Sequence, residues 1–416
     1  MQDKDLYATI LGIQRPWRVC RVDVRRDADE IEVFIEHDGS ALACPVCGSA
    51  TPRYDGRSRT WRHLDTCQYK TLLTADVPRV KCAEHGVRQA SVPWAEPGGR
   101  FTALFEMLAI DWLSETSIAA IARRLRVTWD ELDGIMRRAV TRGLARRRVE
   151  PVTDLGVDET SFQKRHEYVT VVTDITRARV LEVADDRGEA ALRGFYAGLS
   201  EEQLASIRAV AMDMWPPYIN ATRHYVPDAE SKIAFDRFHV ARHLNEAVND
   251  VRKREHRELR AQGDDRLLRT KFLWLMGPQR RDELSLERQA QFNALRMCSL
   301  KVARAWAIKE TARHLWSYTA RGWARRAWKR WIGWAQRSRL EPMRKAARTV
   351  KEHLWGIVNA IALGVTNATA ESINAKIQWI KNTACGFRNR ARFRAAILFH
   401  CGDLDLYPRL PTHTDS

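Results

Sequence analysis

The sequence predicts a protein of several domains that mixes α and β structure (α+β and α/β), and three observations support this. The chain has 416 residues, which favours two or three domains over one. Hydrophobic residues make up 45% and aromatic residues 9%, enough for packed cores and unlike a disordered chain. Along the chain, paired Cys and His positions come first, a mixed strand and helix pattern follows from residue 152, and residues 239–360 are almost wholly helical in pattern.

The charge is strongly basic and unevenly distributed. The formal net charge is +17, and a protein this basic usually binds a polyanion. Residues 241–350 contain 27 Lys and Arg against 11 Asp and Glu, so this one segment carries nearly all of the excess. The alternative is a set of solvated helix faces.

The N-terminus, MQDKDLYATIL, is charged and has no apolar run typical of a signal peptide. No stretch approaches the roughly 18 apolar residues of a membrane span. We therefore expect a cytoplasmic protein, in which the eight cysteines are thiols or metal ligands and not disulfides.

Residues 1–40 resemble a short lead-in with one strand at 30–37, and residues 41–95 contain two pairs of metal-binding residue types. Cys44 and Cys47 form a CPxCG turn, and Cys82 and His85 form a second turn. Two tight turns with four such ligands, joined by two strands, predict a tetrahedral zinc site in a zinc ribbon. A lone CxxC can also be redox-active.

Other cysteines and histidines leave alternatives open. His63 and Cys67 lie between the two pairs and could replace one ligand. The isolated Cys20, Cys298, Cys385 and Cys401 are expected to be small buried hydrophobic residues.

Residues 96–150 predict a helix-turn-helix. Helices are expected at 101–113, 116–125 and 129–140, with Thr128 as the N-cap of the third. An ordinary helical hairpin would have the same periodicity. A run of arginines continues to residue 148 and suits either phosphate contacts or a solvated linker. The candidate DNA-binding residues in this region are Arg123, Arg124, Thr128, Arg137 and Arg138.

Residues 152–240 alternate between strand and helix patterns. The expected strands are 154–159, 168–174, 179–184, 207–213 and 231–235, with a hairpin turn at 175–178 and a helix at 189–199.

Three carboxylates occupy informative places in this pattern. Asp158 ends the first strand, Asp213 ends the fourth, and Glu371 lies on an expected helix near the C-terminus. An RNase H-like fold brings these three places together, where carboxylates can hold two hard cations such as Mg²⁺ or Mn²⁺. Each acidic residue alone is weak evidence, because acids often end strands.

Several strings resemble the ISL3 family of bacterial insertion-sequence transposases. They are CPVCG, WRHLD, KCAEHG, GVDETSF, MDMWPPY, DRFHVARHLNEAVNDVR, NATAESINAKI and ACGFRNRARFRAAIL, and together they extend from about residue 40 to about residue 402. The resemblance implies a DDE triad at Asp158, Asp213 and Glu371, and an all-helical insertion between the second Asp and the Glu.

The DRFH string also resembles a (C/D)xxH signature of eukaryotic DDE superfamilies. This resemblance implies that His239 lies near the active site and helps to order it. The alternative is a histidine that caps the first helix of the insertion.

The insertion is rich in Trp and Arg. Most of its tryptophans recur at helical spacing and are expected in the core, while residues 321–330 are the best candidate for DNA contact. The candidate DNA-binding residues of the insertion and of the segment after Glu371 are Arg325, Arg326, Lys329, Arg330, Lys376, Lys381 and Arg388. Asn374 and Arg390 lie close behind Glu371 as well, and this group could position the transposon end. Solvent exposure alone is the alternative for the residues after Glu371.

Taken together, these observations predict five parts. They are an N-terminal region with the zinc ribbon (1–95), a helix-turn-helix (96–150), the first part of the catalytic core (151–240), the insertion (241–360) and the last part of the core (361–416). The expected function is metal-dependent cleavage and strand transfer of double-stranded DNA at terminal inverted repeats, by a homodimer in a synaptic complex. A catalytically silent DNA-binding repressor and a stand-alone RNase H-like nuclease are the alternatives.

Overall fold

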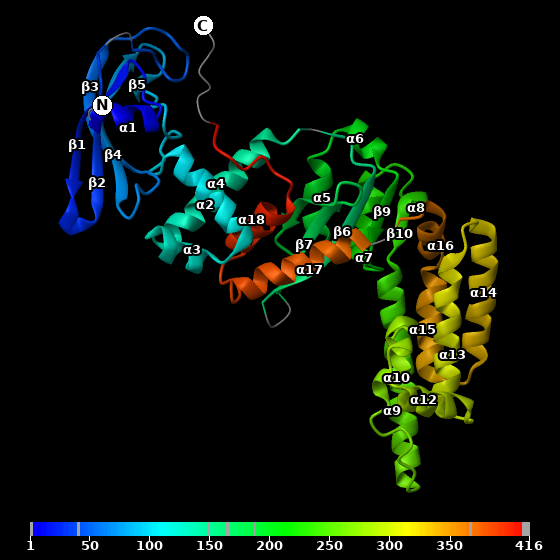
Figure 1. Ribbon diagram of the computed structural model, residues 1–416. Helices are drawn as coiled ribbons and strands as arrows, with labels where there is room; N and C mark the ends of the chain where they lie inside the picture. Colours follow the sequence, from blue (N-terminus) through cyan, green and yellow to red (C-terminus); the bar gives the residue numbers. More distant parts are fainter. Residues whose placement is uncertain are drawn as a thin grey trace. The chain divides into compact units, whose positions relative to one another are not determined.

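The computed structural model describes residues 3–39, 42–148, 150–163, 167–186, 188–365 and 368–409. The chain forms two compact units: unit 1 comprises Met1–Arg147 and Leu404–Ser416, and unit 2 comprises Arg148–Asp403 (Figure 1). The chain therefore leaves unit 1 once, builds all of unit 2 and returns to unit 1. Within the described ranges, no helix is long and apolar enough to cross a membrane.

Unit 1 begins with α1 (Asp3–Ile10) and a five-stranded sheet. The strands are β1 (Trp17–Arg25), β2 (Glu30–His37), β3 (Arg53–Arg62), β4 (Lys70–Cys82) and β5 (Gly86–Gln89), with a short 3₁₀ turn η1 (Arg26–Ala28) between the first two. Their order is β1-β2-β4-β3, with β5 also paired to β4, and only the β2–β4 pair is parallel. The strand expected at 30–37 is confirmed, with Ile31, Val33 and Ile35 alternately buried.

The interpretation of residues 1–40 as a lead-in is wrong. Strand β1 pairs along its length with β2, and β2 pairs with β4, so these residues form one sheet with the strands between the two Cys/His turns. Strand β1 was missed because most of its residues are only partly buried or exposed, so its sequence lacks a clear apolar alternation.

Helices α2 (Ala103–Glu115), α3 (Ile118–Leu125) and α4 (Trp129–Arg146) follow. Each begins at a hydroxyl N-cap, and the predicted cap Thr128 forms a capping box with Glu131. The third helix is longer than expected. Its last turns pack against the C-terminal segment, where a Cβ on Gly143 would approach the Leu404 side chain to 2.6 Å.

The C-terminal residues of unit 1 bind to α4 and α2 through polar contacts. Arg142 donates to the Leu406 carbonyl, and Arg146 donates to the Tyr407 carbonyl at 2.7 Å. The Tyr407 hydroxyl in turn donates to Asp111 at 2.5 Å. These contacts extend α4 beyond the point where the local sequence predicted its end.

The WRHLD string joins the sheet of unit 1 to its helices. Trp61 is buried in the sheet core, and Arg62 pairs with Asp65 and donates to the carbonyl of Leu125 at the end of α3. The ring of His63 hydrogen-bonds Thr102, the N-cap of α2, at 2.9 Å. The string therefore has a structural role that fixes the helices on the sheet.

Unit 2 contains a second five-stranded sheet. Its strands are β6 (Asp154–Gln163), β7 (Glu167–Asp174), β8 (Arg179–Ala184), β9 (Ala209–Met212) and β10 (Ile233–Phe235). The order is β10-β9-β6-β7-β8; β6, β7 and β8 are antiparallel neighbours, whereas β9 is parallel to both β6 and β10. All five expected strands are present, and β6 is longer than predicted.

The helices that follow the hairpin strands cover the sheet and connect its parallel strands. They are α5 (Glu189–Ala197), α6 (Glu201–Ser206), α7 (Pro216–Tyr225) and α8 (Ala229–Lys232). Leu155 and Val157 of β6 share a buried cluster with Leu192 and Tyr196 of α5, so one face of the sheet packs on this layer. Gly156, on the opposite face, leaves no room for a side chain because a Cβ there would lie 2.4 Å from Thr173 Oγ1.

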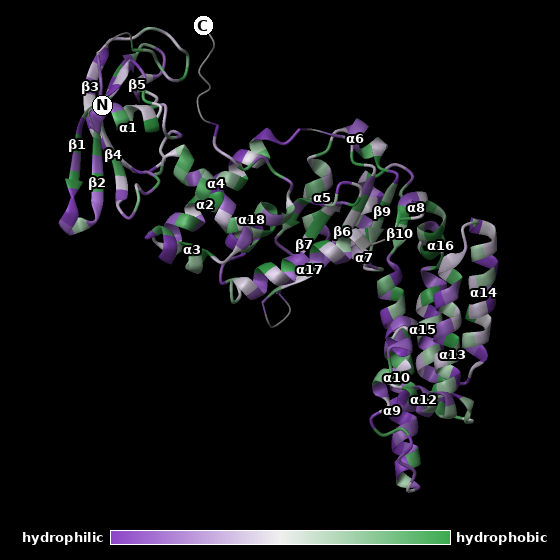
Figure 2. Cartoon of the chain, in the orientation of Figure 1, coloured by the Kyte–Doolittle hydropathy of each residue, from purple (hydrophilic) through white to green (hydrophobic). Residues whose placement is uncertain are grey.

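A helical bundle separates β10 from the last two helices in the chain. It consists of α9 (Arg237–Ala261), α10 (Lys271–Leu275), α11 (Pro278–Asp282), α12 (Leu286–Met297), α13 (Lys301–His314), η2 (Leu315–Ser317), α14 (Arg321–Arg337), α15 (Glu341–Glu352) and α16 (Leu354–Leu363). Helix α9 leaves the sheet at β10 and runs beside α13 and α15, while α16 returns to β10 (Figure 1). Most of these helices show both hydrophilic and hydrophobic residues along their length (Figure 2).

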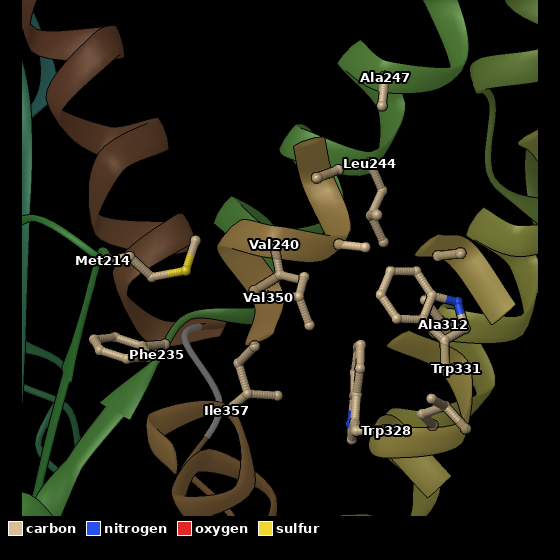
Figure 3. Close-up of a cluster of buried hydrophobic side chains, with 14 of the residues drawn as sticks. Met214, Phe235, Val240, Leu244, Ala247, Ala312, Trp328, Trp331, Val350 and Ile357 are labelled. Atoms are coloured by element: carbon tan, nitrogen blue, oxygen red, sulfur yellow. The ribbon is translucent and has the colours of Figure 1, made fainter. Parts of the chain in front are cut away.

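One hydrophobic core joins the sheet to this bundle. Met214 and Phe235, at the ends of strands, belong to the same buried cluster as Trp328 and Trp331 of α14 (Figure 3). The prediction that most tryptophans of this region are buried is confirmed for four of them: Trp274, Trp306, Trp328 and Trp331. Trp323 and Trp334 are exposed and stay available for other contacts.

The chain ends with α17 (Ala368–Thr383), which packs against β6, and α18 (Arg390–Cys401), which packs against β8. The helix predicted around Glu371 is confirmed. Of the four isolated cysteines expected to be buried, only Cys401 is; Cys20 and Cys298 are partly exposed, and Cys385 is exposed in a positive-φ turn after α17.

Candidate functional site

The two Cys/His turns of unit 1 meet as predicted. Cys44 and Cys47 lie in the loop before β3, Cys82 ends β4, and His85 lies in the turn to β5. The donor atoms of all four lie within 4.8 Å of one another. Sγ of Cys82 is 3.7 Å from Sγ of Cys47 and 3.6 Å from Nδ1 of His85, close to the edge of about 3.8 Å expected for a zinc–thiolate tetrahedron.

The electrostatics of this group favour metal binding. Hydrogen bonds with Ser49 lower the pKa of Cys47 to about 6, so its thiolate forms readily. His63 is buried on Thr102, and Cys67 is exposed in a turn between β3 and β4; neither belongs to the cluster. The four residues therefore fit a structural zinc ion, and the two alternative ligands do not.

In unit 2, three aspartates lie in one row at the point where the parallel pairing of β6, β9 and β10 stops. The prediction that Asp158 ends its strand is wrong, because β6 continues to Gln163 along β7. Met212 is the register partner of both Val157 in β6 and Phe235 in β10. The next residues are Asp158, Asp213 and Asp236, and neighbouring strands lie about 4.8 Å apart. The amide of Asp236 extends the ladder by donating to Met212 O at 3.0 Å. Two predicted catalytic residues and one unpredicted carboxylate thus share an edge of the sheet.

His239 connects two of these carboxylates. It lies in the first turn of α9, whose N-cap is Asp236 and not the histidine itself. Its Nδ1 is 3.3 Å from Oδ2 of Asp213, and its Nε2 is 3.8 Å from Oδ2 of Asp236. The N-cap of α9 is thus Asp236, and the ring of His239 lies between two carboxylates of the row.

Asp158 is held by a side chain from α17. Asn374 Nδ2 donates to its Oδ2 at 2.6 Å, and the amide of Glu159 donates to its Oδ1 at 2.8 Å. Burial raises the pKa of Asp158 above its usual value in spite of these donors, and the nearby Asp236 charge acts in the same direction. A cation at this edge would offset both the burial and the repulsion between carboxylates.

Helix α17 presents Glu371 to the same region. Glu371 lies one turn before Asn374, so the two share a helix face. On that face, Lys381 Nζ donates to the backbone oxygen and the hydroxyl of Ser161 at 2.6 and 3.0 Å, which holds α17 on β6. Glu371 is exposed, and it lines a cavity of about 440 Å³ together with Asp236.

The three carboxylates of the predicted triad are near one another but do not form a compact ligand set. Among the described residues, the Cys/His group of unit 1 is the one group of three or more acidic, His or Cys side chains whose donor atoms all lie within 4.8 Å of one another. The edge of the sheet brings Asp158 and Asp213 together, and Glu371 borders the cavity beside them. The oxygen-rich chemistry of this edge suits Mg²⁺ or Mn²⁺.

Asp236 and Asn374 also belong to this site, although neither was assigned a catalytic or metal-binding role from the sequence. Asp236 is the acid of the DRFH string, which the resemblance places near the active site, and the parallel register of β10 and β9 sets its position in the row. Asn374 carries a local signal, because it lies three residues after Glu371 and so must share its helix face.

The predicted DNA-binding residues have different surroundings. Arg137 and Arg138 pair with Asp133 and Glu106, whereas Arg123 and Arg124 are exposed and form no ion pair with another described residue. Exposed cations without an ion pair to any described residue are also found on α14 and around α17: they are Arg325, Arg326, Lys329, Arg330, Lys376 and Arg388. Thr128 is exposed but serves as the N-cap of α4. The ammonium group of Lys381 is engaged in a hydrogen bond to the backbone oxygen of Ser161.

Comparison with known proteins covers nearly the whole chain. Residues 155–397 match the ISL3 family of DDE domains, described as a transposase. Residues 90–140 match the helix-turn-helix domain of transposase family ISL3, and residues 41–85 match the zinc finger of transposases IS204, IS1001, IS1096 and IS1165.

Two relatives are similar along their entire length. The transposase for insertion sequence element IS1557 from Mycobacterium tuberculosis is 28% identical, with 99% of each chain covered. The transposase for insertion sequence element IS1001 from Bordetella parapertussis is 25% identical, over 94% of this chain and 97% of the relative.

Proposed function

We propose that this chain, which belongs to the ISL3 family of transposases, cuts and joins the DNA ends of the insertion sequence that encodes it, in a metal-dependent reaction at Asp158, Asp213 and Glu371. The observation that carries this proposal is the row of carboxylates directly after the last paired residues of β6 and β9, which faces the helix that bears Glu371. Strand order β8-β7-β6-β9-β10, with the first three antiparallel, supports an RNase H-like core with α9–α16 as its insertion.

The side chains of the site have separable roles. Asn374 orients one carboxylate oxygen of Asp158, and the other accepts a hydrogen bond from the backbone amide of Glu159. His239 restrains Asp213 through Nδ1, and its Nε2 lies near Asp236, so the ring would keep the two acids in place. Divalent cations bound by the triad would activate the attacking oxygen and stabilise the leaving oxygen at phosphorus.

DNA recognition is assigned to surfaces of both units. In unit 1, the helix-turn-helix with Arg123, Arg124 and Thr128 would contact the terminal inverted repeats. The bound zinc ion would stabilise the two Cys/His turns of the zinc ribbon. In unit 2, the exposed cations of α14 and α17 would contact the phosphate backbone. We place the enzyme at the bacterial nucleoid as a homodimer, because two ends must be joined. The five-part division at residues 95, 150, 240 and 360 is kept, except that Leu404–Ser416 belong to unit 1 and not to the core.

The proposal is tested with purified protein and labelled DNA that carries the sequences flanking its gene. Wild-type protein should cut at the repeat tips only with Mg²⁺ or Mn²⁺. Asp158→Asn, Asp213→Asn and Glu371→Gln should each bind the DNA but fail to cut it. Asp250→Asn is the matched control, because Asp250 is an exposed acid of α9 paired with Lys253. Specific binding without cutting by the wild type would instead identify a silent DNA-binding protein.

The zinc assignment has its own test. Wild-type protein should contain about one zinc ion per chain, and Cys47→Ser should lose it. Cys67→Ser is the matched control, since Cys67 is an exposed cysteine of the same unit outside the cluster. Equal zinc content in both variants would contradict the assignment.

A further inference from the structure

A cavity beside the carboxylate row has no role in the proposed chemistry itself. Its volume is about 440 Å³, within the range of roughly 300–1,000 Å³ typical of ligand pockets. Ala211 of β9 and Ala234 of β10 line it, each two residues before an aspartate of the row. Since side chains alternate along a strand, the cavity lies on the same face of the sheet as Asp213 and Asp236.

Small side chains keep this space open. Besides the two strand alanines, Ala241 of α9 and Ala360 of α16 line the cavity. A larger residue at any of these positions would occupy the hollow, so the sequence maintains an open volume next to the reactive edge.

Besides the fully buried Phe235, two aromatic rings border the space. Phe238 follows Arg237 in the first turn of α9 and is 55% exposed, although most large apolar side chains of unit 2 are buried. Trp316 of η2 is half-buried, and its ring meets the fully buried Trp328 edge-on at 5.7 Å between centroids. One ring is thus held by the core, and the other is presented to solvent at the mouth of the cavity.

The charges at the cavity are mixed. Asp236 and Glu371 line it on the side of the proposed cations. Arg237 lines it as well, is exposed, and forms no ion pair with another described residue. A ligand with a flat aromatic part and an attached phosphate matches this combination of rings, guanidinium and metal-binding acids.

We propose that the cavity receives one unpaired base of the DNA strand next to the scissile phosphate. The base would stack on Phe238 and Trp316, and Arg237 would bind the phosphate of the same nucleotide. Stacking on aromatic side chains accepts every base, so the site would hold a nucleotide at a defined position and not select its sequence. This inference rests on the proposed function and adds a nucleotide-binding subsite to it.

The test uses cleavage of the flanking DNA, with binding measured separately. Phe238→Ala removes an exposed ring without disturbing the core, and Ala241→Leu fills the cavity. Each should reduce the cleavage rate at least tenfold while the affinity for DNA stays unchanged. Phe272→Ala is the matched control, because Phe272 is a 70% exposed ring of α10 outside the cavity, and it should cut at the wild-type rate.

Abasic DNA provides a readout that a purely structural defect would not produce. Each substrate of a series lacks a single base, at a different position around the cut. For Ala241→Leu, one of these substrates should restore the rate to within about threefold of wild type, because the obstructed base is absent.

The outcomes separate the two proposals. Wild-type rates for both variants, or a slow Ala241→Leu that no abasic substrate rescues, would overturn the subsite and leave the transposase function standing. If wild-type protein cuts none of the DNAs, the proposed function fails, and the subsite fails with it.

Discussion

Helix α4 of unit 1 and helix α14 of unit 2 each carry a dense run of basic residues, and the two runs have different surroundings. In α4, Arg137, Arg138, Arg142 and Arg146 each lie within 3.3 Å of a carboxylate oxygen. In α14, Arg325, Arg326, Lys329 and Arg330 are exposed and form no ion pair with another described residue. The comparison shows that arginine density alone does not locate a nucleic-acid surface, because the acids nearby decide whether the charge is available.

The partners on α4 come from distant parts of the chain. Arg142 is nearly buried and donates to Glu96 and to Glu106, which is itself 3% exposed. These carboxylates raise the pKa of Arg142 despite its burial. The α4 arginines therefore hold unit 1 and its C-terminal segment together through ion pairs, whereas the four α14 cations have no carboxylate partner among the described residues.

The largest effect is expected from Glu106→Ala. The substitution would leave Arg138 without its acid and Arg142 with Glu96 alone, and breaking a buried ion pair typically costs about 3–5 kcal/mol. Hydrogen exchange of α2 and α4 amides, followed by mass spectrometry, should show this loss, while amides of unit 2 serve as an internal reference. Glu115→Ala, on the exposed end of the same helix, should leave exchange unchanged. Unaltered protection in Glu106→Ala would mean that the α4 network does not stabilise unit 1.

His400 is a largely buried basic side chain without such carboxylate partners, and its pKa shifts in the opposite direction to that of Arg142. Burial, and then the Lys376 ammonium, lower the pKa of His400 to about 4. The unfolded state, with an ordinary pKa near 6.5, binds a proton first as the pH falls. The stability from neutral His400 is therefore present above about pH 6.5 and is lost between about pH 6.5 and 4, by up to about 1.4 kcal/mol for each pH unit.

His400→Asn isolates this contribution. At pH 5 the variant should recover about 1–2 kcal/mol of the free energy of unfolding that wild-type unit 2 loses in acid. Hydrogen exchange of α18 amides at pH 5 and 7.5 measures this difference. His314→Asn, at an exposed histidine of α13, should keep the acid dependence of the wild type. The same acid dependence in His400→Asn and wild type would show that His400 does not contribute.

The α14 surface should respond through DNA affinity and not through stability. Arg325→Ala with Arg326→Ala should weaken binding roughly tenfold at physiological salt and reduce the slope of log affinity against log salt by about 2, since each phosphate contact contributes about 0.9. The matched control is Arg344→Ala with Arg348→Ala on α15, because both arginines pair with Glu341. An equal loss in both double variants would remove the distinction between paired and available arginines.

How far the sequence predicts this protein depends on the range of the interactions involved. The N-cap at Thr128, the alternation in β2 and the turn between β7 and β8 are local features, and all were predicted. The two Cys/His turns also met as expected, because the ligand types and their spacing define a tetrahedral site. Where the element is built from short-range contacts, pattern and propensity are sufficient.

The missed features depend on contacts between distant residues. Asp236 enters the site through the parallel register of β10 and β9, and β1 joins its sheet although its own pattern is irregular. The arginines of α4 were assigned to DNA because Glu106 and Asp405 could not be recognised as their partners from the sequence. Long-range pairing of this kind follows from the tertiary structure alone.

The smallest effect is expected from Arg137→Ala. This variant tests most directly the comparison between the paired arginines of α4 and the unpaired cations of α14. Arg137 is 57% exposed, and its pair with Asp133 is an i,i+4 contact within α4. Such pairs contribute only about 0.3–0.5 kcal/mol, so the stability of unit 1 should hardly change. DNA affinity should also stay within about twofold of wild type, whereas Arg123→Ala, at an exposed arginine of α3 without an ion pair to a described residue, should weaken it more. A larger loss from Arg137→Ala would mean that the exposed pair opens on binding, because DNA phosphates can compete with one carboxylate more easily than with the buried network around Arg142.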